Sequence, residues 1–230
     1  MKCSAIVTGG TGGLGAAVVT RLLDDGWRVV VPWVVEAELE RVHEQPGLEL
    51  AHADLFEPSA VAEVVRKGAE DAEAPLRGLV NLVGGFAMGG RVHETAIEEF
   101  ENQFRLNLRA TYLMTQAALG SMLKGGGGSI VCVGTRAAVQ PFSGAAGYIS
   151  SKAAVIAFAE AVAVEYRDDG IRCNAILPSV IDTPANRASM PNADHERWVK
   201  PRAIAGVIAD LLSDESSPVS GAAIPVYGRA

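Results

Sequence analysis

The sequence predicts an α/β fold in which about seven strands form a doubly wound parallel sheet with helices on both faces. Apolar runs of strand length alternate with segments of helical period along the whole chain. Several of these runs are almost continuous in Val, Ile and Leu, which is typical of strands buried on both faces of a parallel sheet. Because no linker, composition break or internal repeat divides residues 1–230, we expect one domain.

The order of elements follows from these two patterns. Strand-like runs lie at residues 3–8, 28–34, 48–52, 79–83, 129–135, 172–177 and 222–226. Segments with helical period lie at residues 13–25, 36–44, 58–70, 95–123, 146–167 and 201–212. The four glycines at residues 125–128 predict a turn after a long helix. Residues 187–200 are polar and contain Pro191, so we expect a loop or a short helix there, over a site or on the surface.

The composition excludes several classes of protein. Of the 230 residues, 49% are hydrophobic and 20% are charged, which is enough apolar material to form a full core and excludes disorder. The formal net charge of −7 disfavours nucleic acid and anionic membranes as partners, because proteins that bind polyanions usually carry the opposite balance. No uninterrupted apolar run reaches the roughly 18 residues that span a bilayer, so no membrane partner is expected.

Cysteine and histidine usage favours a cytoplasmic protein without a metal site. Cys3, Cys132 and Cys173 are odd in number and lie far apart in apolar runs, so we interpret them as buried reduced thiols. The four histidines show no metal-ligand spacing. The N-terminus lacks the apolar core and cleavage site of a signal peptide, so we expect the protein in the cytoplasm.

A glycine-rich loop follows the first strand and opens the first helix. It reads Thr8-Gly9-Gly10-Thr11-Gly12-Gly13-Leu14-Gly15 and satisfies two related patterns of dinucleotide-binding loops. Glycines let the backbone approach a pyrophosphate, whose charge the N-terminus of the helix then stabilises. A Gly-Lys-Ser/Thr ending is absent from the loop, so a nucleoside-triphosphatase loop is excluded. We therefore expect a bound dinucleotide at this position.

The choice between NAD and NADP stays open. An acidic residue about twenty positions after the loop would bind the ribose 2′-hydroxyl of NAD, whereas an arginine would accommodate the 2′-phosphate of NADP. The tip of the second strand reads Val31-Pro32-Trp33-Val34, with Glu36 slightly beyond, so neither residue type occupies it. Trp33 could pack on the adenine or simply on the protein.

Tyr148 and Lys152 lie four positions apart at the start of a helical segment. This spacing places both side chains on one helical face. A free tyrosine has a pKa of about 10, too high for effective proton exchange at neutral pH, and a cation held close favours the phenolate. The pair therefore predicts a proton-exchanging tyrosine assisted by a lysine.

Together with the glycine loop, this pair makes the sequence resemble the short-chain dehydrogenase/reductase family over nearly its whole length. The family's Thr-Gly-x3-Gly-x-Gly matches residues 8–15 and its Tyr-x3-Lys matches residues 148–152. Asn107 resembles the asparagine that holds a water in the family's proton relay. The resemblance implies a Rossmann fold and this set of cofactor-binding residues: Thr8, Gly9, Thr11, Gly12, Gly13, Leu14, Gly15, Trp33, Asp54, Leu55, Asn81, Val83, Gly84, Tyr148, Lys152, Pro178, Ser179, Ile181 and Thr183.

The sequence departs from the family pattern at several positions. The catalytic serine normally lies thirteen residues before the tyrosine, where this chain has Thr135. A threonine hydroxyl can still donate to a carbonyl oxygen, although its methyl group stiffens χ1 and narrows the pocket. The usual Pro-Gly after the sixth strand is Pro178-Ser179, and Asn81-Leu82-Val83-Gly84 differs at two positions from the family's Asn-Asn-Ala-Gly. These changes affect substrate inference more than reaction class.

The resemblance implies an NAD(P)-dependent oxidoreductase that interconverts a carbonyl and a secondary alcohol of a small molecule. Tyr148 would exchange the proton, Thr135 would polarise the substrate oxygen, Lys152 would lower the tyrosine pKa and bind the nicotinamide ribose, and Asn107 would anchor a water. Activity resembling that of 3-oxoacyl-carrier-protein reductases is one option, and a dihydropteridine-type reductase is another. The alternative of a different class is a non-catalytic dinucleotide-sensing protein on the same fold.

The resemblance also implies a homodimer or homotetramer. The helical segments at residues 95–123 and 146–167 would pack across two-fold axes. Ala153, Ala154, Ala157 and Ala161 would allow close approach of such helices, although packing on the chain's own sheet would use them equally well.

Overall fold

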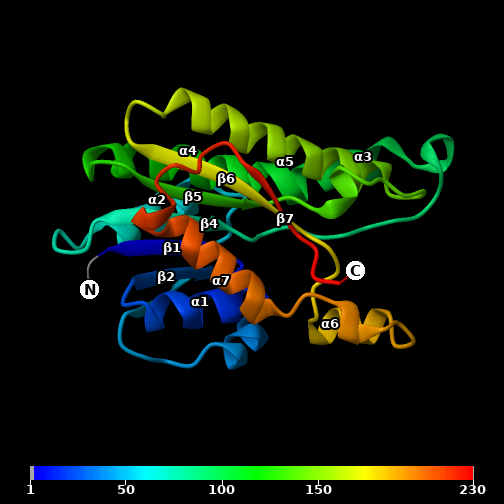
Figure 1. Cartoon of the computed structure of the whole chain (residues 1–230), viewed down its shortest axis with the longest axis horizontal. Helices are drawn as coiled ribbons and strands as arrows, with labels where there is room; N and C mark the ends of the chain where they lie inside the picture. The colour runs from blue at the N-terminus through cyan, green and yellow to red at the C-terminus, as the bar shows by residue number, and fades with distance from the viewer. Residues whose placement is uncertain (1–2, 230) are drawn as a thin grey trace.

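Seven parallel strands form one sheet in the order β3-β2-β1-β4-β5-β6-β7, in a computed structural model that describes residues 3–229 (Figure 1). Their bounds are β1 (Ser4–Thr8), β2 (Arg28–Trp33), β3 (Leu48–His52), β4 (Leu76–Asn81), β5 (Gly128–Val133), β6 (Ile171–Pro178) and β7 (Ala223–Val226). Chain order reverses between β1 and β4, and open parallel sheets bind ligands beside the carboxyl ends of the strands at such a switch point. The predicted doubly wound sheet is confirmed.

Helices cover both faces of this sheet (Figure 1). One layer contains α2 (Pro58–Ala69), α4 (Ala110–Lys124) and α5 (Ala146–Glu165), and the other contains α1 (Gly15–Asp24) and α7 (Pro201–Leu212). Neighbouring residues of β1 point into opposite layers: Ile6 packs with the first, whereas Ala5 and Val7 pack with the second. The five inner strands are therefore buried on both faces, as their composition predicts, whereas the edge strands β3 and β7 are only partly buried.

The long helix expected at residues 95–123 is not one regular helix. It comprises α3 (Ile97–Phe104), one π-helical turn (Arg105–Arg109) and α4, which ends at Lys124. A π-turn inserts an extra residue into the helical ladder, and such turns are common at functional sites. Here the turn contains the buried Asn107. No pattern of apolar residues distinguishes a π-turn from the α-helix on either side of it.

The helix expected at residues 36–44 is only a 3-10 helix, Glu36–Arg41. None of its residues is buried, so the segment has no apolar face that the core could hold in an α-helix. Residues 187–200, expected as a loop or a short helix, contain the end of α6 (Pro184–Ser189) and a 3-10 turn (His195–Arg197). The remaining 3-10 turns are Val92–Glu94, Arg136–Ala138 and Asp214–Ser216.

The structure corrects the predicted end of the fourth strand and confirms the predicted glycine turn. The expected fourth strand runs to residue 83, but β4 ends at Asn81 because the Thr8 side chain binds the N–H groups of Leu82 and Val83 instead. The glycine turn at residues 125–128 is confirmed: Gly126 and Gly127 have positive φ values of 82° and 106°. Only glycine adopts such angles without strain.

α5 is long and apolar enough, by length and composition, to cross a membrane. Its buried residues, which include Lys152, Val155 and Ala159, instead pack on the sheet. We therefore interpret α5 as a core helix of the α/β fold.

Candidate active site

The functional residues gather at the carboxyl ends of four neighbouring strands. Thr8 ends β1, Asn81 ends β4, Pro178 ends β6, and Thr135 follows β5 by two residues. Because all the strands are parallel, these four positions meet at one edge of the sheet, beside the switch between β1 and β4.

The glycine loop has a backbone shape that side chains would disrupt. A Cβ at Gly15 would collide with the carbonyl oxygen of Gly9, and a Cβ at Gly13 would lie 2.9 Å from the Thr183 methyl group. Gly9 has a φ of +64°. The loop leads directly into α1, whose first N–H groups face the loop, as they do at the start of any helix. This bare backbone at a helix N-terminus fits a dinucleotide pyrophosphate.

Thr8 ties the glycine loop to the next strand. Its hydroxyl accepts hydrogen bonds from the N–H groups of Leu82 at 3.0 Å and Val83 at 3.3 Å. Asn81 is buried, and its Nδ2 donates to the Thr115 hydroxyl at 3.1 Å. The Thr8 side chain therefore positions the backbone after β4, whereas the Asn81 side chain links β4 to α4.

Other predicted cofactor-binding residues each have a defined partner within the protein. Asp54 Oδ1 accepts from the N–H of Phe56 at 2.9 Å, and the Leu55 side chain packs in the core. The Ser179 hydroxyl donates to the Tyr227 carbonyl at 2.7 Å. Ile181 forms an isolated bridge with Val199, which fixes the segment after β6. Trp33 packs edge-on against His52, with the ring centroids 4.8 Å apart.

The catalytic residues predicted from the sequence lie together at the start of α5. Lys152 is buried, and its ammonium group donates to the Val133 carbonyl at 2.9 Å. Thr135 is also buried, and its hydroxyl oxygen accepts from the N–H of Ala137 at 3.3 Å. That contact uses a lone pair and leaves the hydroxyl hydrogen to donate, and Thr135 hydrogen-bonds to Tyr148.

Asn107 connects the π-turn to the loop after β4 and to α5. Its Oδ1 accepts from the N–H of Gly85 at 3.0 Å, and its Nδ2 donates to the Ser151 hydroxyl at 3.1 Å. A Cβ on Gly84 would lie 2.6 Å from Asn107 Oδ1 and 3.0 Å from Lys152 Nζ, so only glycine fits there. The Asn107 side chain is thus occupied by protein partners, and its role in a water relay remains a prediction.

Burial dominates the ionisation of the catalytic pair. It raises the pKa of Tyr148 above its usual value, against the opposing effect of the hydrogen bond with Thr135. Burial also lowers the pKa of Lys152 to about 8, because the charged ammonium loses solvation. Burial and the hydrogen bond with Thr135 are the causes of the Tyr148 shift, and a lowering of the tyrosine pKa by Lys152 stays a prediction. Tyr148 carries its proton at neutral pH.

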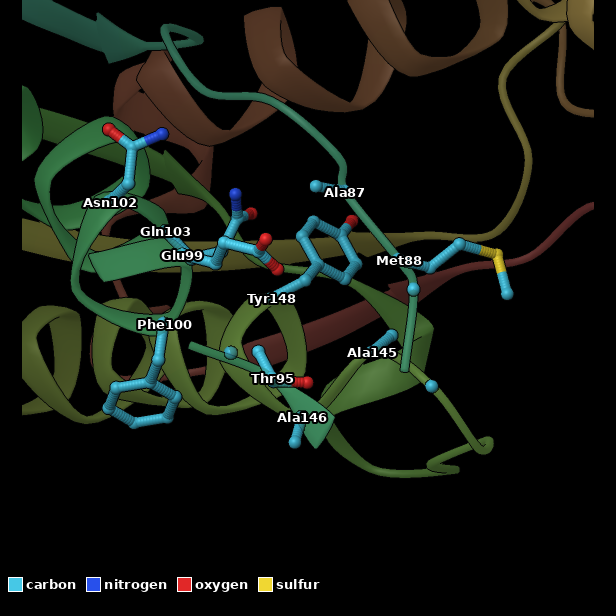
Figure 2. A pocket seen from close by; sticks show the side chains of 13 residues that line it. Ala87, Met88, Thr95, Glu99, Phe100, Asn102, Gln103, Ala145, Ala146 and Tyr148 are labelled. Atoms are coloured by element: carbon cyan, nitrogen blue, oxygen red, sulfur yellow. The ribbon is translucent and has the colours of Figure 1, made fainter. Parts of the chain in front are cut away.

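A pocket of about 180 Å³ lies beside Tyr148 (Figure 2). Its wall comes from the loop at residues 87–89, from α3 and from the first turn of α5. In Figure 2 the Tyr148 ring projects among these segments. Phe86 packs edge-on against Tyr148 with centroids 4.9 Å apart, and Phe142 lies 6.4 Å from Phe86.

Sequence reasoning missed Glu38, which reaches the glycine loop from the 3-10 helix after β2. Its Oε2 accepts from the Thr11 hydroxyl at 2.8 Å, and its Oε1 pairs with Arg41 at 3.0 Å. The contact joins residues 27 positions apart. Because Glu36, Glu38 and Glu40 share one short acidic segment, no local pattern selects the one that turns toward the loop. Among residues 3–229, no group of three or more metal-ligating side chains is present.

Comparison with known proteins assigns the chain to a family. The family model described as short chain dehydrogenase matches residues 4–194. The chain is 31% identical to 2-(R)-hydroxypropyl-CoM dehydrogenase of Xanthobacter autotrophicus, over 99% of this chain and 98% of that protein. It is 30% identical to dehydrogenase/reductase SDR family member 4 of Oryctolagus cuniculus, over 98% and 92%. It is also 29% identical to the cyclic-di-GMP-binding biofilm dispersal mediator protein of Escherichia coli, over 98% and 95%.

Solved structures agree with the fold. A short-chain type dehydrogenase/reductase from Mycobacterium ulcerans superposes with a TM-score of 0.91 at 25% identity, covering 100% of this chain and 90% of that chain. ElxO with NADP bound superposes with a TM-score of 0.90 at 23% identity, covering 99% and 98%, which shows the same fold. With the family model matching most of its length, the chain belongs to the short-chain dehydrogenase family and is an oxidoreductase that uses NAD(P).

Proposed function

We propose that the chain interconverts a carbonyl and a secondary alcohol on a small molecule, with Tyr148 as the acid and base that exchanges the proton. The observation that carries this proposal is the convergence of Tyr148, Thr135 and Lys152 at the carboxyl edge of the sheet, beside the glycine loop. When bound, the nicotinamide supplies or accepts the hydride. The protein supplies position and electrostatics.

The protonated phenol of Tyr148 favours reduction of a carbonyl at neutral pH. The pKa of Tyr148 is raised by burial, so the phenol holds the proton that a carbonyl oxygen needs when it becomes an alcohol. The Thr135 hydroxyl donates to that oxygen and keeps it next to the phenol. Lys152 follows Tyr148 by four residues on α5 and is held by the Val133 carbonyl, and its charge would stabilise the phenolate left after proton transfer.

The apolar rim of the site favours a substrate with an apolar group next to its carbonyl. Phe86, Met88 and Phe142 are exposed large apolar residues; Phe86 packs against Tyr148, and Phe142 lies beside Phe86. Burying such a group against them would remove apolar surface from water. A 3-oxoacyl thioester has this character. A dihydropteridine-type reductase is the weaker option, because Thr135 keeps the hydroxyl that a site without the serine would lack.

The experiment is a turnover panel with NADH and NADPH, containing aryl and alkyl ketones, a 3-oxoacyl thioester, a dihydropteridine and secondary alcohols. We expect oxidation of the reduced cofactor with at least one ketone or 3-oxoacyl compound and return of the reaction with the matching alcohol. The rival function is a dinucleotide sensor, which gains support from the similarity to a cyclic-di-GMP-binding protein of Escherichia coli. Tight cofactor binding with no turnover across the whole panel would favour the sensor.

We further propose that the protein is a cytoplasmic homodimer or homotetramer formed through α4 and α5. Ala153, Ala157 and Ala161 are exposed at four-residue spacing, so they do not pack on the chain's own sheet. Val164 on the same helix is 65% exposed. A second copy of α5 would cover this stripe closely. Light scattering should give a multiple of the 24.0 kDa chain, and a monomer at micromolar concentration would overturn the proposal.

A further inference from the structure

The glycine loop carries a fixed carboxylate. Thr11 is buried, and its hydroxyl donates to Glu38 Oε2 at 2.8 Å. Glu38 Oε1 pairs with Arg41 Nη1 at 3.0 Å, and the same Nη1 donates to the Thr11 carbonyl at 3.3 Å. Two of these contacts hold the 3-10 helix against the loop, and the third pairs the carboxylate of Glu38 with Arg41 on the same helix.

This carboxylate could supply the acceptor for the ribose 2′-hydroxyl that is absent from the tip of β2. In dinucleotide-binding sheets, an acidic side chain beyond the second strand accepts hydrogen bonds from the ribose 2′-hydroxyl. β2 ends at Trp33, and the next two residues are valines, so the tip offers no such group. Glu38 lies five positions after Trp33, and its contact with Thr11 returns it to the loop that begins the dinucleotide site.

Charge around Glu38 disfavours a phosphate. A 2′-phosphate carries a charge near −2, and it would have to draw Arg41 away from Glu38 and then face the unpaired carboxylate. Asp54, which follows β3 next to β2, adds a second carboxylate at this edge of the sheet. A ribose diol has the opposite requirement, since its hydroxyl groups donate to carboxylates.

We propose that Glu38, held by Thr11 and Arg41, is the residue that makes this enzyme select NAD(H) over NADP(H). The inference rests on the glycine loop as the dinucleotide site and is independent of the substrate. In this role Arg41 is a positioning residue: it orients the carboxylate and is not available to a phosphate.

The test measures binding, because the substrate is not needed for it. Dissociation constants for NADH and NADPH are obtained from nicotinamide fluorescence with the wild-type protein, Glu38→Gln and the control Glu40→Gln. The control lies on the same 3-10 helix, is exposed and changes net charge equally. We expect the wild type to bind NADH at least about 30-fold more tightly than NADPH, as loss of one charged hydrogen bond plus repulsion would give.

In Glu38→Gln the dissociation constant for NADPH divided by that for NADH should fall at least about tenfold. Most of this change should come from tighter NADPH binding, because Arg41 can then bind the 2′-phosphate. Adding Arg41→Ala to Glu38→Gln should remove most of this gain. The ratio for Glu40→Gln should stay within about twofold of the wild type, since its charge is exposed and screened.

The possible failures are distinguishable. Wild-type protein that binds NADPH as tightly as NADH, or an unchanged ratio in Glu38→Gln, overturns the role of Glu38 and leaves the enzyme assignment intact. Binding of neither cofactor contradicts the proposed function itself. Thermal unfolding of each variant without cofactor shows whether a changed ratio comes from a changed fold.

Discussion

At the scale of single residues, Thr135 occupies the position where the family has a serine, and its hydroxyl is oriented by the backbone. The N–H of Ala137 donates to its oxygen at 3.3 Å, which directs the hydroxyl hydrogen elsewhere. Because a serine would present the same hydroxyl, the γ-methyl group of Thr135 is the only chemical difference.

Replacing Thr135 with alanine should lower kcat about 100-fold, because the substrate oxygen loses a preorganised donor. Thr135→Ser should keep kcat within about threefold of the wild type, since the donor is retained. Steady-state kinetics on the best substrate of the panel checks both variants. An alanine variant with wild-type turnover would exclude this role.

Burial of the charged Lys152 lowers the free energy of unfolding at neutral pH. Its pKa falls from 10.5 to about 8 because it is buried, so folding takes a charged ammonium out of water. Below pH 8 both the folded and the unfolded states carry the proton, and the cost is fully present. Between pH 8 and 10.5 the unfolded state binds more protons than the folded state, so the free energy of unfolding rises with pH.

Lys152→Met should therefore be more stable than the wild type at pH 7, by about 1 to 3 kcal/mol after loss of the hydrogen bond to Val133. Its advantage should shrink as the pH approaches 10, because the wild-type lysine then becomes neutral in the folded state. Urea unfolding of both proteins at pH 7 and 9.5 measures this. A variant less stable at pH 7, with no difference in pH dependence, contradicts the account.

Residues differ in how far the sequence alone could place them. Tyr148 and Lys152 are four positions apart on one helix, so their spacing is local information. Glu38 and Thr11 meet only because a short 3-10 helix turns back on the loop, and the sequence contains no local mark of that turn. The pKa of Tyr148 could not be predicted either, because it depends on burial and on contacts with Thr135 and Phe86, which are distant from it in sequence.

At the scale of elements, the start of α1 shows how glycine is used. The glycine loop and α1 pack so closely that Gly15 touches the Gly9 backbone. Gly206 is the contrasting case, because it lies inside α7 and a Cβ there would meet only the flexible end of Arg21 at 3.6 Å. The two glycines therefore differ in backbone contact as well as in position, since Gly15 is the first residue of its helix.

Gly15→Ala should destabilise the protein by at least about 2 kcal/mol and weaken cofactor binding, because the clash is with backbone that cannot rotate away. The matched variant Gly206→Ala should stabilise it by about 0.5 to 1 kcal/mol, since alanine is the better helix former. Denaturant unfolding and cofactor titration are the measurements. Equal effects of the two substitutions would show that the loop tolerates a side chain.

The sequence predicted element boundaries correctly where hydrophobic periodicity sets them. The predictions were wrong where side-chain hydrogen bonds end or interrupt an element. β4 stops at Asn81 because Thr8 takes the next two N–H groups, although Leu82 and Val83 continue the apolar pattern. The interruption of the segment at residues 95–123 follows the same rule. Its π-turn allows Asn107 to reach Gly85 and Ser151, which are far from it in sequence.

At the scale of the whole molecule, the alternation of strands and helices predicted the doubly wound parallel sheet, and the structure supplies its strand order. The site then follows from the switch between β1 and β4, where the glycine loop meets the segments after β4, β5 and β6. Substrate identity does not follow from topology, because the loops that carry Phe86 and Phe142 have no structural constraint readable from sequence.

The most direct test of the assignment is the Tyr148→Phe variant, which removes one oxygen atom from the centre of the site. We predict that NADH affinity stays within about threefold of the wild type, since we expect the pyrophosphate at the helix N-terminus. Turnover of the best carbonyl substrate should fall at least about 1000-fold, because the positioned acid is gone. Retention of most of the wild-type turnover by Tyr148→Phe would contradict the central claim.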